Sequence, residues 1–162
     1  MRKFIVLVVL LLSACVQRPD PDPAVMRDTA PPWDAPRDAI SYIDAAGLEQ
    51  RPIGEDTDPW IIALTVEVGG RRVEVPPMVG IDRLRAVQAV VHTHDGGGNV
   101  WLEGPDNREA TLGEFFTLWG VEFDGTCLAK HCDLTVLADG AEVDDPAGLQ
   151  LRGHHTVEVR AR

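Results

Sequence analysis

His92 and His94 stand two residues apart in the segment VVHTHDGGGNVWLEG, which also contains Glu103. Side chains two residues apart on a β-strand point to the same face, so both imidazoles would be directed to one side. A carboxylate from Glu103 on the neighbouring strand would complete a two-histidine, one-carboxylate arrangement, which is typical of divalent metal sites. Zinc, copper and non-haem iron all accept imidazole ligands. The spacing therefore predicts a metal site and leaves the identity of the metal open.

The pairing of the two predicted strands decides which face these side chains occupy. A two-residue turn at Gly96 and Gly97 places His92 opposite Trp101. A three-residue loop would split the apolar side chains between both faces, so core formation favours the two-residue turn. In that register the core face carries Val91, Val100 and Leu102, and the opposite face carries His92, His94, Asn99, Trp101 and Glu103. We therefore expect both histidines to lie away from the core, where their replacement leaves the fold intact.

Further residues could add ligands to this site. Asp95 lies at the predicted turn and offers a second carboxylate. His154 and the adjacent His155 begin the last predicted strand, and one of them could complete the set of ligands if that strand lies beside the hairpin. We therefore include Asp95 and His154 among the candidate ligands.

Two other functions are compatible with the same residues. In the first, the domain binds no metal, and Trp101 and the histidines contact a partner protein or a cell-envelope component. In the second, which has less support, a metal at this site serves an oxidase or a hydrolase. Other catalytic patterns are missing, because no serine stands in a nucleophile elbow and no GK[ST] follows the glycines. The sequence gives no specific reason to expect an enzyme.

The chain has three cysteines, for which the sequence predicts two different modifications. Cys15 belongs to a lipid-attachment motif, which leaves Cys127 and Cys132 as a pair. In an oxidising compartment this pair would form a disulfide that closes a short loop. The alternative is a metal site in the segment CLAKHC, with His131 between two thiolates. We favour the disulfide, because soft-metal thiolate sites are usually found where thiols stay reduced.

The first residues have the order of a bacterial lipoprotein signal peptide. Arg2 and Lys3 supply the positive start, an apolar run extends from residue 4 to residue 12, and two small residues precede Cys15. The apolar run is too short to span a bilayer as a helix. We expect removal of residues 1–14 and acylation of Cys15. The lipid would then hold the protein on a membrane of the bacterial cell envelope, facing outside the cytoplasm.

The charge of the chain argues against nucleic acid as a partner. It has 26 acidic and 15 basic side chains for a formal net charge of −11, and loss of the two positive charges of Arg2 and Lys3 would leave −13. Phosphates and anionic lipid head groups repel such a surface. Attachment to a membrane must therefore come from the lipid and not from a basic patch.

Composition divides the chain into four parts. After the signal peptide, residues 15–37 contain the lipidated cysteine and a tether rich in Pro and Asp, in which Trp33 is expected to be incidental. Repeated prolines favour extended polyproline II structure, which could hold a domain up to roughly 60 Å from the membrane. Residues 38–58 form a short helix, ended by Gly47, and a linker. Residues 59–162 have the length for one modest hydrophobic core and form the globular domain.

The globular part combines strand patterns with a single helix pattern. Apolar alternation on both sides of Gly69-Gly70 predicts a first β-hairpin, and the histidine segment predicts a second. TLGEFFTLWG predicts an amphipathic helix with Thr111 as N-cap and Glu114 completing a capping box. LTVLADGAEV and HHTVEVRA predict further strands. This order favours a small α+β domain similar to a β-grasp, with a β-sandwich that contains an inserted helix as the alternative.

Several segments together resemble a family of secreted or lipid-anchored bacterial and archaeal proteins that carries no established activity. They are VEVGGRRVEVPPMVGID, VVHTHDGGGNVWLEG, TLGEFFTLWGV, LTVLADGAEV and LRGHHTVEV. The family pattern runs from a glycine-containing hairpin and a VPxxIGI-like turn through LHTHDxxGxIHxE to TLGxFFxxWG, and the resemblance spans roughly residues 46–159. It marks His92, His94, Asp95, Glu103, Phe116, Trp119 and His154.

The chain also departs from this family pattern. Members often have histidines just before the first hairpin strand, where this chain has Trp60-Ile61-Ile62-Ala63. If those histidines contribute to a metal site, this chain lacks them. The departure favours a structural or partner-binding role over a metal.

Overall fold

The computed structural model describes residues 19–54, 58–105 and 109–162, so the predicted signal peptide and Cys15 lie outside the described residues. The described chain contains two helices and a mainly antiparallel set of strands, which confirms the predicted α+β class. Neither of these helices has the length and apolar character needed to cross a bilayer.

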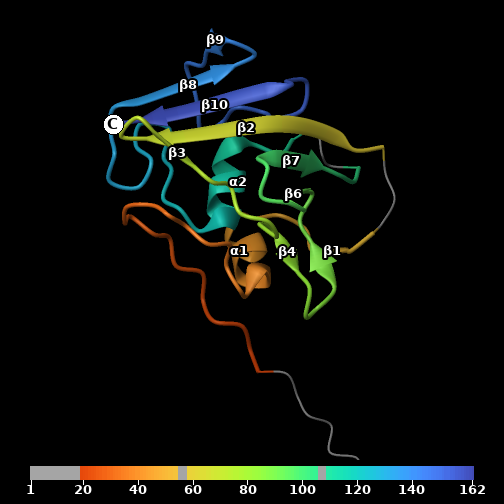
Figure 1. Ribbon diagram of the computed structural model, residues 1–162. Coiled ribbons are helices and arrows are strands. Elements are labelled where there is room, and N and C mark those ends of the chain that lie inside the picture. Colours follow the sequence, from red (N-terminus) through yellow and green to blue (C-terminus); the bar gives the residue numbers. More distant parts are fainter. Residues whose placement is uncertain (1–18, 55–57, 106–108) are drawn as a thin grey trace, which may run out of the picture.

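One mixed sheet forms the centre of the domain (Figure 1). Its strand order is β6 (Val91–His92), β7 (Asn99–Leu102), β2 (Trp60–Val68), β10 (Thr156–Ala161), β8 (Leu134–Ala138) and β9 (Ala141–Glu142), and β3 (Arg71–Val73) pairs with the end of β2. β2 and β10 are parallel, and the other pairs in this sheet are antiparallel. The first long strand and the last strand therefore lie side by side in the middle, as in a β-grasp-like sheet.

Side-chain alternation gives this sheet a buried and a solvent-facing side. The buried residues at its centre are Ile62, Leu64 and Val66 in β2 and Val157 and Val159 in β10. The residues between them are partly or fully exposed. β2 turns into β3 at Gly69-Gly70, where both residues have positive φ. Glycine adopts this conformation without strain, and the predicted first hairpin is confirmed.

Helix α2 (Leu112–Trp119) covers the buried side of the sheet (Figure 1). The side chain of Thr111 accepts a hydrogen bond from the Glu114 N–H at 3.2 Å, and the Glu114 carboxylate accepts one from the Thr111 N–H at 2.7 Å. The predicted capping box is therefore present. The aromatic side chains that α2 buries completely are Phe115, Phe116 and Trp119. In the described part of the chain, this helix and not a second large sheet completes the core.

The second hairpin has the predicted register. His92 of β6 lies opposite Trp101 of β7. The turn before β7 is pressed against β2, because the Leu64 N–H donates to the Gly98 carbonyl at 2.8 Å. A Cβ atom at Gly98 would lie 2.5 Å from the Leu64 oxygen, and the φ of Gly98 is +82°. Only glycine fits at this point, which fixes the hairpin to the central strand.

A smaller sheet and a short helix border this hairpin. β1 (Arg51–Pro52), β5 (Val87–Gln88) and β4 (Ile81–Asp82) form a three-stranded sheet in that order. Helix α1 (Ala39–Ala45) packs against α2 and is followed by Gly47 with a positive φ of 70°. The short helix predicted for residues 38–58 is therefore present, but it belongs to the globular domain.

The expected tether through residue 37 is wrong for its described part. Trp33 is 2% exposed, and its ring meets that of Trp119 edge-on with 5.8 Å between centroids. The Arg27 side chain donates to the Gly120 carbonyl at 2.9 Å and to the Trp119 carbonyl, so it caps the end of α2. Even the Pro19 carbonyl accepts a hydrogen bond, from Arg85. The buried indole of Trp33 and the guanidinium of Arg27 therefore dock this segment on the domain, although its composition alone predicts extended chain.

The cysteine loop closes as expected. Cys127 and Cys132 are joined by a disulfide with an S–S distance of 2.14 Å. The loop also contains His131, which the alternative reading placed among metal ligands. Both thiols are used by the disulfide, so the predicted pairing stands and the thiolate metal site does not form.

Asp139 connects the turn after β8 to the start of β10. Its carboxylate accepts hydrogen bonds from the backbone N–H groups of His155 and Thr156 and from the side chain of His154, each at 2.9 Å. The two backbone donors, followed by His154, hold the pKa of this carboxyl well below its usual range. Asp139 also has a φ of 50°, in the left-handed region.

Replacement of Asp139 should separate these two roles. Asp139→Gly adopts the positive φ but loses the acceptor, whereas Asp139→Asn keeps an acceptor oxygen, so we expect the glycine variant to have the lower melting temperature. The carboxylate stabilises the fold fully above its unfolded pKa of about 3.9, and this contribution is lost as the pH falls toward the lower folded pKa. Thermal unfolding followed by circular dichroism should show that the difference in melting temperature between the wild type and Asp139→Gly becomes smaller below about pH 4. A difference that is independent of pH would exclude this role.

Candidate metal centre

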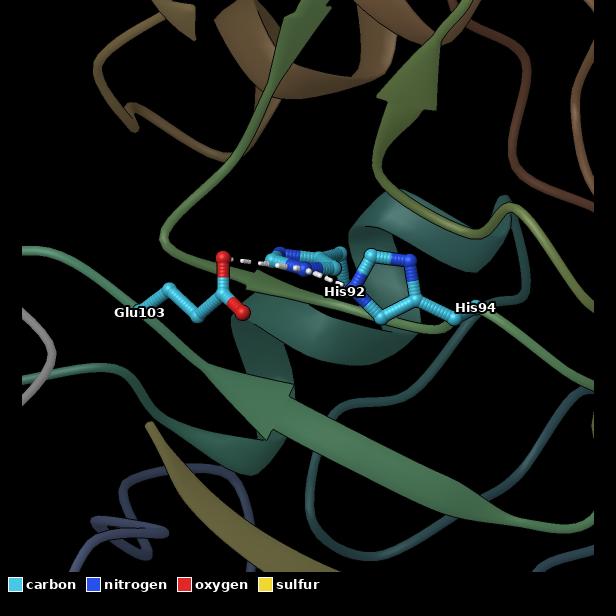
Figure 2. A group of neighbouring side chains, drawn as sticks. All are labelled: His92, His94 and Glu103. Carbon is cyan, nitrogen blue, oxygen red and sulfur yellow. Dashed lines mark hydrogen bonds and ion pairs between the residues drawn. The ribbon is translucent and has the colours of Figure 1, made fainter. Parts of the chain in front are cut away.

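The side chains of His92, His94 and Glu103 converge at the end of the second hairpin (Figure 2). One possible ligand atom from each of them lies within 4.8 Å of the other two. His92 comes from β6, His94 follows that strand, and Glu103 follows β7. In Figure 2, His92 lies between the imidazole of His94 and the carboxylate of Glu103. The structure thus brings together the three residues on which the sequence prediction was based.

The distances between these atoms suit a common ion. The two Nε2 atoms of His92 and His94 are 3.1 Å apart, and His92 Nε2 is 3.7 Å from Glu103 Oε2. Ligand atoms that bind one ion at about 2.0–2.2 Å lie roughly 2.8–3.6 Å from one another, with octahedral coordination at the lower end and tetrahedral coordination at the upper end. Both separations are near that range. His94 is exposed and Glu103 is partly exposed, so their side chains can turn to close the third edge of the triangle.

His92 is oriented by a hydrogen bond on its other nitrogen. Its Nδ1–H donates to the Ala89 carbonyl at 2.9 Å. A carbonyl only accepts, so the proton of the neutral ring is on Nδ1, and Nε2 carries a lone pair that accepts a hydrogen bond from His94 Nε2–H when no metal is bound. Metal-binding histidines typically have such an outer hydrogen bond, which fixes the tautomer and the ring orientation.

Burial keeps His92 neutral. The pKa of His92 is lowered mainly by its burial, and the neighbouring His94 lowers it further. The Ala89 carbonyl and the Glu103 carboxylate act in the opposite direction but are outweighed. A neutral imidazole is the form that binds a metal, so this environment favours the ligand state of His92.

Gln88 supports Glu103 from the smaller sheet. Its side-chain amide donates to Glu103 Oε2 at 3.0 Å, and Gln88 is 3% exposed. Its strand β5 pairs with both β1 and β4, which fixes its position. Gln88 was not among the residues predicted from the sequence to contribute to the site. Its signal is a single polar residue within the apolar stretch AVQAVV.

The expected exposure of both histidines is correct for His94 only. His92 has no solvent-exposed surface. The reason is that the segment before β4 runs along the free edge of β6, where the Thr93 N–H donates to the Val79 carbonyl and the Ala89 N–H to the Gly80 carbonyl. Backbone from outside the second hairpin therefore covers His92. The pattern of the two hairpin strands alone does not predict this contact.

Asp95 and His154 lie outside the cluster. The Asp95 carboxylate accepts a hydrogen bond from the Gly97 N–H at 2.9 Å and so shapes the turn. His154 donates to Asp139 just before β10, which β7 and β2 separate from β6. Strands three places apart in a sheet are about 14 Å apart, too far for a shared ion. The last strand does not lie beside the hairpin, so the condition under which His154 was a candidate ligand is not met.

Trp101 forms one wall of the centre. It is half-buried between His92 and Ile61 on the neighbouring strands, and its ring lies edge-on to His94 with 5.0 Å between centroids. Its indole N–H and the Oε1 atom of Gln88 are buried atoms without a hydrogen-bond partner among the described residues. A buried donor and a buried acceptor therefore remain unsatisfied beside the three candidate ligands.

Comparison with protein-family models, with curated proteins and with solved structures gave no match for this chain.

In the absence of metal, replacement of His92 and replacement of His94 should change the stability of the fold by different amounts. His92→Ala removes a buried ring and its hydrogen bond to Ala89, so we expect the free energy of unfolding to fall by about 1–3 kcal/mol. His94→Ala removes an exposed ring and should change it by less than about 0.5 kcal/mol. Urea unfolding in the presence of a chelator measures both. Equal effects of the two substitutions would contradict the burial of His92.

Proposed function

We propose that this protein is a lipid-anchored, extracytoplasmic domain that binds a divalent metal through His92, His94 and Glu103. The observation that supports it most directly is the convergence of two imidazole nitrogens and one carboxylate oxygen within 4.8 Å. Two-histidine, one-carboxylate sites hold zinc, copper or non-haem iron. Metal analysis distinguishes among these three metals.

The surroundings of the three residues favour a metal over a purely structural cluster. His92 offers Nε2 because its Nδ1–H is already bound to Ala89, and Glu103 is held by Gln88. Such outer contacts hold metal ligands in place before the ion arrives. A fully buried imidazole facing a carboxylate with no cation between them would otherwise be a weak pair, because burial disfavours the charged ring.

The unsatisfied atoms beside the cluster suit a metal-bound water. Three protein ligands leave at least one coordination position open. The Trp101 indole N–H and Gln88 Oε1 are a donor and an acceptor of the kind that hydrogen-bond such a water, and neither has a partner among the described residues. An open position is also a requirement for metal-assisted oxidation or hydrolysis, but no second catalytic group supports a specific reaction.

The cellular location in this proposal is supported by the sequence. The lipobox ending at Cys15 and the short apolar run before it are typical of lipoprotein signals. A disulfide between Cys127 and Cys132 agrees with an oxidising compartment. The resemblance of the histidine segment to a secreted or anchored family supports the same assignment. The net charge of −11 favours metal cations over nucleic acid as partners.

Metal analysis tests this function. The full chain, purified without a histidine tag and incubated separately with zinc, copper(II) and iron(II), should retain one equivalent of at least one metal after gel filtration. His94→Ala and Glu103→Gln should each weaken the binding of that metal by more than the roughly 10- to 100-fold that loss of an outer contact costs. Isothermal titration calorimetry and elemental analysis measure the effect.

His154→Ala is the matched control, because it removes an imidazole from the same protein at a distant place. Its affinity for the metal should equal that of the wild type. Absence of stoichiometric metal under all three conditions would contradict the proposal and favour the rival role, a metal-free module in which Trp101 and the histidines contact an envelope partner. Retention of metal by His94→Ala would place the site elsewhere.

Acid should release the metal. Protons compete with the ion for the imidazole nitrogens, so the affinity should fall as the pH drops from about 7 to about 5. Burial lowers the pKa of His92, so its loss of affinity should begin at a more acidic pH than for an exposed histidine. Calorimetric titrations in buffers across this range check the sign. An affinity that rises on acidification would exclude imidazole ligation.

A further inference from the structure

A second cavity lies away from the candidate metal centre. It has a volume of about 640 Å³ and lies between the docked segment at residues 30–32, the β2–β3 hairpin and His131. It shares no lining residue with the cluster of His92, His94 and Glu103. Its volume falls within the range of about 300–1,000 Å³ that is usual for small-molecule sites.

The walls of this cavity are mainly apolar. Pro31 and Pro32 line one side, and Val68 and Val73 of the hairpin line another. The two valines are almost completely buried, with 7% and 6% of their surfaces exposed, so they form a firm floor. This cavity forms only because the segment around Trp33 docks on the domain. It would suit the apolar body of a ligand.

The rim of the cavity carries an unpaired positive charge. Arg71 and Arg72 line it and are exposed, and neither forms an ion pair or a side-chain hydrogen bond with a residue in the described ranges. The acidic lining residue, Glu74, has its Oε1 beside Gly96 at the neighbouring turn. Two arginines that line one cavity are unusual on a chain of net charge −11. Their planar donor groups match the geometry of a carboxylate.

We propose that this cavity is a binding site for a small carboxylate with an apolar body, separate from the metal centre. The carboxylate lies at Arg71 and Arg72, where each guanidinium donates to its oxygens. The apolar body packs on Pro31, Pro32 and Val73. No bond is made or broken, so the site is one of recognition.

Calorimetry with a matched set of probes tests this site. The full chain in lipid nanodiscs, with empty nanodiscs as the blank and a chelator present, is titrated with 4-phenylbutanoate, 4-phenylbutanamide and acetate. We expect 4-phenylbutanoate to bind at least about tenfold more tightly than the other two, because only it has both the charge and the apolar body. Arg71→Gln/Arg72→Gln should remove most of this preference.

Arg160→Gln/Arg162→Gln is the matched control, since it also removes two positive charges but from residues that line a different cavity. It should bind 4-phenylbutanoate as the wild type does. Equal binding of the acid and the amide, an unchanged affinity in Arg71→Gln/Arg72→Gln, or an equal loss in the control would each overturn the proposal. Lack of saturable binding by any probe would overturn it as well. The chelator makes all these outcomes independent of the metal centre.

Discussion

Burial of the aromatic face of α2 against the central sheet is the interaction on which the rest of the structure depends. Phe116 stacks on Trp119 with 5.7 Å between ring centroids, and both are completely buried. The far end of the same helix receives Trp33 and the Arg27 guanidinium. The helix also contacts β6, which carries His92: Leu118 and the Cβ of His92 both approach Gly80, where an added Cβ atom would lie 2.8 Å from the Val91 carbonyl oxygen. Hydrophobic packing therefore positions a polar site.

Local patterns were sufficient to predict the two helices and the main strands of the central sheet, but not the smaller sheet of β1, β4 and β5. Alternation around Gly69-Gly70, the capping box from Thr111 to Glu114 and the register that pairs His92 with Trp101 are all properties of short segments, and all three are observed. Hydrophobic periodicity and turn chemistry act within about ten residues, so one sequence contains them in full. The three residues of the candidate centre followed from that register.

Long-range contacts could not be predicted in the same way. The burial of His92 comes from backbone near Gly80, and the support of Glu103 comes from Gln88 on another sheet. The wrong expectation for His154 arose because strand order is set by tertiary packing, which placed β2 and β7 between β10 and β6. Trp33 was misread because composition averages over a segment, whereas a single indole in a prepared pocket is enough to dock it.

The docking of the chain from Pro19 onward changes how far the domain can extend from a bilayer. If Cys15 carries lipid as proposed, only four residue steps separate it from the Pro19 carbonyl that Arg85 holds. Four steps of extended chain cover at most about 14 Å, less than half the thickness of a bilayer. The domain would then rest at the height of the lipid head groups with little rotational freedom. Anything it binds would have to be met along the membrane plane, and large assemblies farther out in the envelope would be beyond its reach.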